Sequence, residues 1–376
     1  MAGFKCPVTL DYQAHRMMIA YFLGKYEEQK PDFKWSEVIE GAIFSVLETS
    51  VLTDLKWNVK EHLKRSPTRR KKLNEYVLQR LEPLLLKLDE SFLIRFKGYL
   101  NGNRSNKIGR RVLLAAGEHA REWEFRLLEN ANPEGYEIQK IRGSMDKEKS
   151  LHDLYGCRQL HKYPKYRNFV DICGELRYQG RWSHTHIAPR IDVLGHSMYV
   201  ATMSYLFSIE VGACERQRVN NFFLGLFHDL AETQTRDVRG PLKKDVPVID
   251  DTLDELTREM MEREIVKLLP PSWQDEFRGW AVTETGKNFV ILEGRKTEVT
   301  NDEILSKYNT NNYNPVCGYL VKIADNLSAF IESSQAIKNG CESPELQAAR
   351  YSISKNYERK LLGKFDVGLL FRELSS

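Results

Sequence analysis

Three segments of the chain repeat apolar residues at intervals of three and four positions, and this pattern limits the fold more than any other feature of the sequence. They are residues 193–207, 218–232 and 315–334. Such spacing places the apolar side chains along one face of an α-helix, which must then pack against a core. We therefore expect an all-α fold. The only plausible sheet is a pair of short β-prone runs within residues 288–299, separated by a glycine, which predicts at most a small hairpin.

The chain is long enough for two domains. Its 376 residues exceed the roughly 100–200 that are usual for one domain. A long polar stretch at residues 130–150 is rich in turn-forming residues and predicts a boundary near residue 150. We therefore predict one helical domain over residues 1–150 and another over residues 151–376.

Composition favours a soluble, folded protein without selecting its partner. Hydrophobic residues make up 41% of the chain and charged residues 29%, a mixture too apolar for wholesale disorder. The net charge of +4 is small for this length, so a polyanionic partner such as nucleic acid is neither required nor excluded. We interpret two basic stretches, residues 64–72 and 101–109, as solvated loops, because no aromatic residues are interleaved with their charges.

The cysteines and the first residues indicate a cytoplasmic protein. The six cysteines form no C-x-x-C pair and show no short spacing typical of a zinc knuckle or a disulfide framework, so we expect reduced thiols. The first residues lack the apolar region of a signal peptide, and no stretch approaches the roughly 18 uninterrupted apolar residues of a membrane helix. We therefore predict no membrane association.

Four polar residues interrupt or end the apolar helical faces: His196, His228, Asp229 and Asp325. A carboxylate in a core helix is costly unless it is paired or bound to a metal. Helices that face one another in a bundle can combine such side chains into a site for a divalent cation. The two-histidine, two-carboxylate set suits Mn, Co, Mg, Fe, Ni or Zn and does not select among them. The alternative is an ordinary buried polar network.

The acids that follow the His-Asp pair fit hydrolysis of a phosphate ester. A bound metal lowers the pKa of water and clamps an anionic oxygen. Glu232 follows His228 by four positions and Asp229 by three, so on a continuing helix it would share their face and act as a general acid or base. Asp237 comes after the expected end of the helix, where its carboxylate could hold water or a sugar hydroxyl.

The order H…HD…D on helices resembles the signature of the HD-domain metal-dependent phosphohydrolases, and residues 181–345 look like their 5′-deoxynucleotidase-like branch. The pair "RW" at 181–182 precedes His196 by about fifteen residues. The string "HDLAETQTRDVRGPLK" follows the branch's pattern HD-x-x-E-x-x-x-x-D-x-x-x-P-x-K, and "LVKIADNLSAFIES" followed by "ELQAA" is similar to its third motif. The resemblance implies an HD-domain helical bundle that binds a divalent metal.

The resemblance also implies a role for each residue. It implies metal ligation by the two histidines and two aspartates named above, with Glu232 as the acid or base and Asp237 as a second acid near the attacking water. It makes Arg181 a phosphate contact, which agrees with the ability of a guanidinium to grip a phosphate through two hydrogen bonds. It places Trp182 beside the sugar and Lys243 in the substrate-binding loop that closes the motif.

One position departs from the branch. The branch commonly has a glutamate just before its first histidine, whereas Gly195 stands there in this chain, so we expect the support of His196 to differ. His184 and His186 lie between Arg181 and the ligand helix. They could touch a bound phosphate, although loop histidines are more often surface residues.

The N-terminal half resembles the C-terminal half in scattered positions. The string "FSVLETSVLTDLKWNVK" (44–60) aligns with "FHDLAETQTRDVRGPLK" (227–243). Upstream, "AHRMMIAYF" resembles "GHSMYVATM", so that His15 matches His196. Repeated strings of this kind indicate a duplicated domain.

Most of the metal ligands are absent from the aligned positions of the N-terminal half. Ser45 and Val46 replace the His-Asp pair, and Gly117 replaces the aspartate of the third motif. We therefore predict that residues 1–150 are a degenerate, non-catalytic HD-like copy and that residues 151–376 form the catalytic domain. Chance similarity between two helical domains is the alternative.

The leading hypothesis is a divalent-metal-dependent phosphohydrolase that acts on nucleotides, with a 5′-(deoxy)nucleoside monophosphate as the first candidate substrate. Within the enzyme class, a nucleoside triphosphate hydrolase and a cyclic-nucleotide or oligonucleotide phosphodiesterase stay open. A nucleotide-sensing or scaffolding protein is the alternative from another class, and the intact ligand set argues against it. Spacing does not set the oligomeric state, so a homodimer remains one option.

Overall fold

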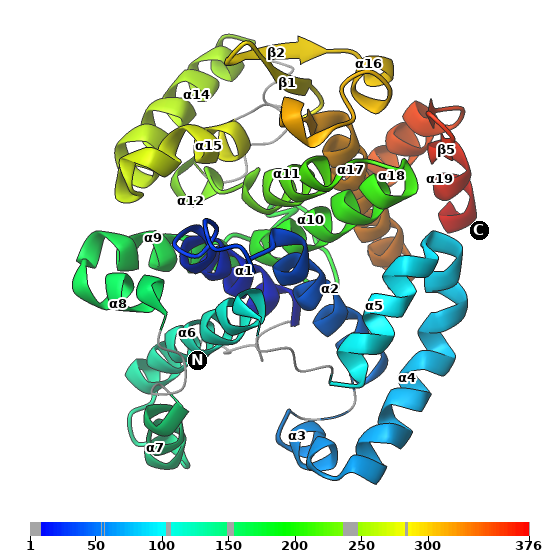
Figure 1. Cartoon of the computed structure of the whole chain (residues 1–376). Helices are drawn as coiled ribbons and strands as arrows, with labels where there is room; N and C mark the ends of the chain where they lie inside the picture. The colour runs from blue at the N-terminus through cyan, green and yellow to red at the C-terminus, as the bar shows by residue number, and fades with distance from the viewer. Residues whose placement is uncertain are drawn as a thin grey trace. The chain divides into compact units, whose positions relative to one another are not determined.

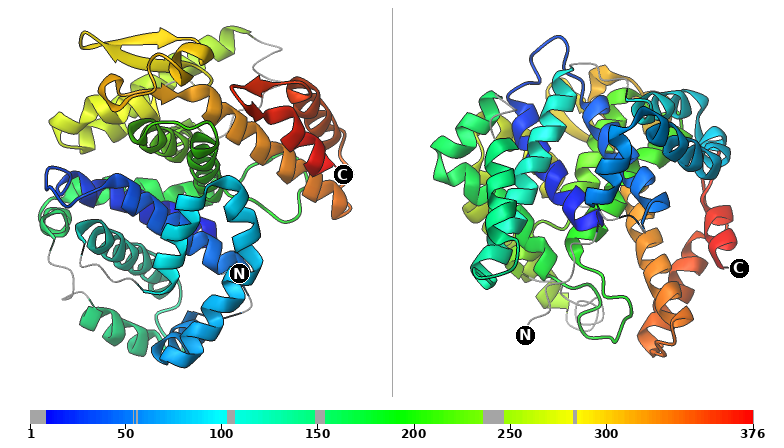
Figure 2. Two further views of the ribbon diagram at one scale, coloured as in Figure 1. Left: turned by 45° about the vertical axis from the view of Figure 1, so that its right-hand side comes forward. Right: turned by 90° about the horizontal axis from the view of Figure 1, so that it is seen from below.

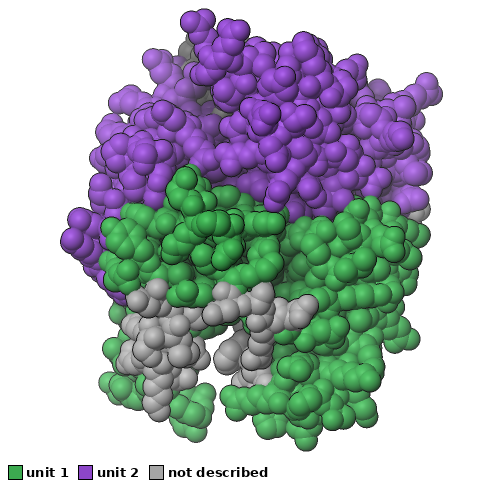
Figure 3. All heavy atoms as spheres, viewed as in Figure 1, with its two compact units in different colours: residues 1–9, 19–158 green, residues 10–18, 159–376 purple. Residues whose placement is uncertain are grey.

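The chain is mainly helical, which confirms the all-α prediction (Figure 1). The computed structural model describes residues 9–53, 55, 57–102, 107–148, 154–235, 247–282 and 285–375. The chain divides into two compact units, which Figure 3 colours separately. Unit 1 comprises residues 1–9 and 19–158, and unit 2 comprises residues 10–18 and 159–376. Within the described ranges, no helix has the length and apolar character needed to cross a membrane.

Unit 1 is built from helices joined by short connections. Its helices are α2 (Trp35–Val51), α3 (Trp57–Arg65), α4 (Pro67–Leu88), α5 (Glu90–Leu100), α6 (Ile108–Ala131) and α7 (Ile138–Glu148). Two more helices, α1 (Thr9–Lys25) and α8 (Tyr155–Lys162), have residues in both units. The division between Arg158 and Gln159 lies a few residues beyond the boundary expected near residue 150.

A core of its own holds unit 1 together. The ring of Phe44 on α2 meets Phe92 and Phe96 on α5, with ring centroids 5.1 and 5.4 Å apart. Beside them, the buried carboxylate of Glu40 accepts hydrogen bonds from two nitrogens of Arg95 at 2.7 and 2.8 Å. Aromatic contacts and a two-bond Arg–carboxylate pair therefore fix α2 against α5.

The positions that align with metal ligands carry no ligand chemistry in unit 1. Ser45 and Val46 are half-buried on α2, and Gly117 is buried in α6. His15 lies on the part of α1 that belongs to unit 2, where its Nε2 is 2.9 Å from the backbone oxygen of Val170. His15 is thus a hydrogen-bonded core residue, and the degenerate copy stays a prediction.

Unit 2 contains the three segments predicted as core helices, which form α10 (Val193–Glu210), α11 (Glu215–Phe227) and α17 (Gly318–Lys338). Its other helices are α9 (Pro164–Glu175), α12 (Glu232–Thr235), α14 (Pro247–Met260), α15 (Pro271–Ala281), α16 (Asn301–Leu305), α18 (Pro344–Tyr357) and α19 (Val367–Ser375). Short 3₁₀ or π turns are η2 (Leu176–Tyr178), η3 (Met261–Ile265), η4 (Val266–Leu268) and η5 (Asn311–Tyr313).

A glycine allows α10 and α11 to approach closely. A Cβ atom placed on Gly225 would lie only 2.9 Å from the Cα of Ala201 on α10. No side chain fits there without moving a backbone, so small residues at this crossing set the distance between the helices. The apolar side chains that predicted these helices are buried, as shown by Val200, Phe222 and Leu226.

The predicted hairpin at residues 288–299 is confirmed, and Figure 2 shows its two antiparallel strands. Strand β1 (Asn288–Leu292) pairs with β2 (Arg295–Val299). Between them, Glu293 and Gly294 both have positive φ, at 51° and 77°, the conformation that a two-residue turn requires. Three two-residue strands were not predicted: β3 (Val316–Cys317) joins β1, and β4 (Leu361–Leu362) pairs with β5 (Phe365–Asp366).

Candidate metal centre

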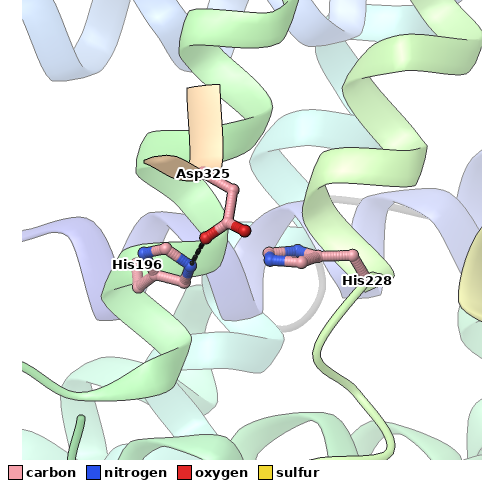
Figure 4. Close-up of side chains that lie close together, drawn as sticks. All are labelled: His196, His228 and Asp325. Carbon is pink, nitrogen blue, oxygen red and sulfur yellow. Dashed lines mark ion pairs between the residues drawn. The ribbon is translucent and has the colours of Figure 1, made fainter. Parts of the chain in front are cut away.

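Three helices of unit 2 bring together side chains from distant parts of the chain. His196 lies in the first turn of α10, His228 caps the C-terminus of α11, and Asp325 lies within α17. Figure 4 shows their polar ends pointing into one space. One ligand atom from each residue lies within 4.8 Å of the others, as binding of a single ion requires. The structure therefore brings together three of the four predicted ligands as one group.

The fourth predicted ligand, Asp229, lies beside this group. Its Oδ2 is 3.2 Å from Nε2 of His228 and 3.5 Å from Nε2 of His196. Asp325 contributes Oδ1 at 3.3 Å from the same nitrogen of His196. The His196 side chain is fully buried, whereas each of the two aspartate side chains is 18% exposed. The centre is thus enclosed by the histidines and reachable from the side of the carboxylates.

Hydrogen bonds on the far side of each imidazole set its tautomer. Nδ1 of His228 is 2.9 Å from the carbonyl oxygen of Gly225, which can only accept, so this nitrogen carries the proton. Nδ1 of His196 is 3.0 Å from the hydroxyl oxygen of Ser328, which donates its own hydrogen to Glu332 at 2.7 Å. Ser328 must therefore accept from His196. In the neutral rings, both Nε2 atoms then present lone pairs.

This arrangement fits a divalent cation. Neither Nε2 atom makes a hydrogen bond within the described residues, although both are buried. Each lone pair faces carboxylate oxygens that are also acceptors, which is unfavourable unless a cation lies between them. Two imidazole nitrogens with carboxylates suit a borderline divalent ion. The residues present therefore match the chemistry of a metal centre.

A proton can occupy part of the same space when no ion is bound. Burial and the charge of Arg181 lower the pKa of His196, but its contacts with Asp325 and Glu332 outweigh them and raise it. Burial raises the pKa of Asp229, yet the neighbouring His228 and His196 bring it below its usual range. The cluster thus favours a proton on His196 and negative charge on Asp229.

The helix carrying the His-Asp pair ends earlier than predicted. A helix continuing to Glu232 was expected, but α11 ends at Phe227, and the next backbone bonds join residues three apart, including Glu232 N to Asp229 O at 3.0 Å. Where the helix ends, the His228 ring bonds the carbonyl of Gly225, a contact between side chain and backbone that can compete with the next helical bond. Glu232 begins α12 and is half-buried. Three-residue turns still align it with Asp229.

Arg181 and Trp182 precede α10 and meet α17. The Nε of Arg181 donates to Glu332 Oε2 at 3.0 Å, and its Nη1 is 3.9 Å from Asp229 Oδ2. The indole Nε1 of Trp182 donates to the same Glu332 oxygen at 2.8 Å. The Trp182 ring packs on a small apolar cluster that contains Leu346. Arg181 therefore borders the metal centre, and its role as a phosphate contact stays a prediction.

Sequence reasoning missed Glu332. Its side chain is only 6% exposed, and burial would raise its pKa, but the guanidinium of Arg181 holds that pKa well below the usual range. The available signal was its position seven residues after Asp325, two helical turns along the same face. A side chain in place of Gly195, such as the glutamate of the branch, would require Asp11 to shift, since a Cβ there would lie 2.5 Å from a carboxylate oxygen of Asp11.

Other candidate residues lie around the centre or outside the described ranges. Asp237 and Lys243 fall within residues 236–246, which the structure does not describe. His184 and His186 are exposed, and both line a cavity of about 800 Å³ formed by residues 178–187 and 190. Lys322 was not predicted; its Nζ is 3.0 Å from Asp325 Oδ2.

The comparisons with known proteins agree with this geometry. Residues 173–351 match the family model described as "HD domain". This span contains the two histidines and two aspartates of the centre together with Arg181, Glu232 and Glu332. A search of curated proteins found no match. The match therefore supports an HD domain over residues 173–351, a family whose members are generally metal-dependent hydrolases.

Proposed function

We propose that this chain is a divalent-metal-dependent phosphohydrolase that acts on nucleotides, with 5′-(deoxy)nucleoside monophosphates as its leading substrates. One observation carries the proposal: within an HD domain, two buried imidazole nitrogens without hydrogen bonds face two carboxylates. In this proposal His196, His228, Asp229 and Asp325 hold a Mn, Co, Mg, Fe, Ni or Zn ion.

The surrounding side chains supply the remaining chemistry. When bound, the ion would supply positive charge that stabilises negative charge on the phosphate and makes water a better nucleophile. Because Nε of Arg181 is committed to Glu332, its Nη groups are the ones that can reach a phosphate oxygen. Glu232 takes a proton from the attacking water or gives one to the leaving sugar oxygen.

The nucleotide assignment rests on motif likeness. The strings around Arg181 and the His-Asp pair resemble the 5′-deoxynucleotidase-like branch, in which a carboxylate and a lysine follow in the loop. We propose Asp237 as the second acid, Lys243 as a substrate contact, and Trp182 as the residue beside the sugar. Since the Trp182 indole N–H is bonded to Glu332, this residue would offer the substrate an aromatic face or edge and no donor.

The loop cavity favours a second candidate, a nucleoside triphosphate hydrolase. Its lining includes Arg181, Arg190, His184 and His186 and has no carboxylate side chain. Such a lining would suit a substrate with more negative charge than a monophosphate carries. Product analysis separates the two candidates: a monophosphatase releases inorganic phosphate from a nucleoside monophosphate, whereas the alternative releases pyrophosphate or triphosphate from a nucleoside triphosphate.

A nucleotide panel with Mn, Co or Mg tests the proposal. The panel includes monophosphates, triphosphates, cyclic nucleotides and short oligonucleotides. We expect wild type to release phosphate only with added metal. The rate of Asp229→Ala should be at least about 100-fold lower than that of wild type, as expected when a group that positions the metal is removed. Asp275→Asn is the matched control, because Asp275 is 98% exposed in the same unit and should retain full activity. Metal-dependent nucleotide binding without turnover would favour the sensor alternative instead.

A further inference from the structure

One buried carboxylate reaches both halves of the candidate site. Oε2 of Glu332 accepts from Arg181 Nε at 3.0 Å and from Trp182 Nε1 at 2.8 Å. Oε1 accepts from Ser328 at 2.7 Å and lies 3.4 Å from Nδ1 of His196. A carboxylate has about four positions that can accept hydrogen bonds. Here Oε2 contacts Arg181 and Trp182, and Oε1 contacts Ser328 and His196. One oxygen serves the proposed phosphate-binding side chains, and the other serves a proposed metal ligand.

The contact with Ser328 forms a directional chain. Ser328 has one hydrogen, which it donates to Glu332, so its oxygen accepts from Nδ1 of His196. The carboxylate thereby keeps the proton on Nδ1 and leaves Nε2 as the lone pair toward Asp229 and Asp325. A neutral group in place of the carboxylate would allow Ser328 to turn its hydrogen toward His196 instead.

The contacts with Arg181 and Trp182 hold the backbone of residues 181–182 in a bend, called the corner below. This conformation is unfavourable without such contacts. Trp182 has φ of 56°, a left-handed conformation that bulky residues rarely adopt. Such a backbone persists when several contacts determine it together. Here these are the indole bond to Glu332 and the packing of the ring against the apolar cluster of Ala336, Cys341 and Leu346. The same corner aims the guanidinium of Arg181 past Glu332 toward Asp229.

We propose that Glu332 is a positioning residue that ties the orientation of the metal ligand His196 to that of the substrate-binding pair Arg181 and Trp182. The inference rests on the proposed function for the roles of these three residues. Its consequence is coupling: a bound divalent ion fixes His196 and therefore Glu332, which in turn orders the corner that receives the phosphate. Metal and phosphate should then increase each other's affinity by equal factors.

The first experiment measures Mn²⁺ binding to metal-free protein by calorimetry and the KM for the best nucleotide of the panel. We expect Glu332→Gln to weaken Mn²⁺ binding about 10–100-fold, as loss of a group that orients a ligand does, and also to raise KM. Glu262→Gln is the matched control, because Glu262 accepts two bonds from Arg278 at 2.6 and 2.9 Å and shares no residue with the metal centre. Both quantities should stay within twofold of wild type in this control.

Two further variants test separately the two arms of Glu332, which are the contacts of Oε1 with Ser328 and His196 and the contacts of Oε2 with Arg181 and Trp182. Ser328→Ala removes the link to His196 and should weaken Mn²⁺ binding while KM at saturating metal changes little. Trp182→Phe removes one donor on the other arm and should raise KM while Mn²⁺ affinity is retained. If Glu332→Gln loses its helical circular dichroism signal and is therefore misfolded, these two variants still test the proposal. The proposal is overturned if Glu332→Gln changes only one of the two quantities, or if Ser328→Ala binds Mn²⁺ like wild type.

Titration of inorganic phosphate makes the outcome independent of turnover. In wild type we expect saturating Mn²⁺ to tighten phosphate binding at least fivefold, and in Glu332→Gln we expect this factor to approach one. If no nucleotide is hydrolysed but this coupling is present and lost in the variant, the proposed function fails while the positioning role of Glu332 stands. Equal coupling in both proteins would contradict that role.

Discussion

The ring of His228 performs two tasks through its two nitrogens. Nδ1 bonds the carbonyl of Gly225 where α11 ends, which fixes the tautomer, and Nε2 then faces Asp229. Hydrophobic periodicity predicted a helix that continues through this histidine, and it carries no information about the bond between the ring and the backbone found where α11 ends. For the same reason Glu232 was expected on a continuing helix.

Replacement of His228 should remove metal binding more than it harms the fold. We expect His228→Ala to weaken Mn²⁺ binding by more than about 100-fold, since loss of a ligand should exceed the 10–100-fold typical of groups that orient ligands. Calorimetric titration provides the measurement. His161→Ala alters an exposed histidine and serves as the control. Retained Mn²⁺ affinity in His228→Ala would remove this residue from the proposed ligand set.

The charge of Glu332 should make stability depend on pH. Burial raises its pKa, but Arg181 and His196 lower it from 4.5 to a value well below the usual range. Near pH 4 the unfolded chain therefore binds more protons at this position than the folded chain, so its contribution to the unfolding free energy is complete above about pH 4.5 and is lost as the pH falls.

Urea unfolding of metal-free wild type and Glu332→Gln measures this contribution. At pH 6 we expect wild type to be more stable by about 3 kcal/mol, because a buried ion pair is broken in the variant. At pH 3.5 the difference should be smaller. Other carboxylates titrate in both proteins, so the difference between the two isolates Glu332. A difference in unfolding free energy between the two proteins that stays constant from pH 6 to pH 3.5 would contradict the low pKa of Glu332.

At the level of elements, the crossing of α10 and α11 sets the spacing of the two histidines. Gly225 contacts the backbone of Ala201, and His196 and His228 extend from the same two helices, with ring centroids 5.4 Å apart. The sequence predicted both helices because their stripes are regular. It did not predict the crossing, since one glycine among apolar residues has the same pattern whether or not a neighbouring helix touches it.

Substitution of Gly225 should therefore affect both stability and metal binding. We expect Gly225→Val to lower the unfolding free energy by about 1–3 kcal/mol through overpacking and to weaken Mn²⁺ binding by separating the histidines. Gly279→Ala is the matched control, because a Cβ on Gly279 of α15 has no neighbour within 4 Å. Replacing a helical glycine of this kind with alanine should raise the free energy of unfolding by about 0.5–1 kcal/mol. Unchanged Mn²⁺ affinity in Gly225→Val would show that the crossing does not set the site.

Elements also show why Glu332 escaped prediction. On α17 the sequence places it after an apolar run, where a glutamate usually marks the solvent face of a helix. Its burial depends on Arg181, which is 151 residues away in the chain. The predicted ligands, by contrast, were recognisable because histidine and aspartate are unusual on an apolar stripe. Local pattern thus identifies the ligands, whereas their support depends on contacts between distant segments.

For the whole molecule, the candidate metal centre lies within one of the two units. The convergent group His196, His228 and Asp325 belongs to unit 2. If residues 1–150 are a degenerate copy, the full chain should bind one divalent ion in this class of site. Calorimetry with Mn²⁺ should give a stoichiometry near one, and Asp325→Asn should abolish the binding. Two tight ions per chain would contradict the degenerate copy.

The assignment of residues 10–18 to unit 2 has a consequence for synthesis of the chain. Asp11 occupies the space beside Gly195, and His15 bonds Val170, so α1 contributes to a core whose other members follow residue 158. As the polypeptide leaves the ribosome, unit 1 can gather its own helices early. The beginning of α1, however, must await partners made more than a hundred residues later. The unit with the metal centre is therefore completed by a segment that is synthesised before unit 1.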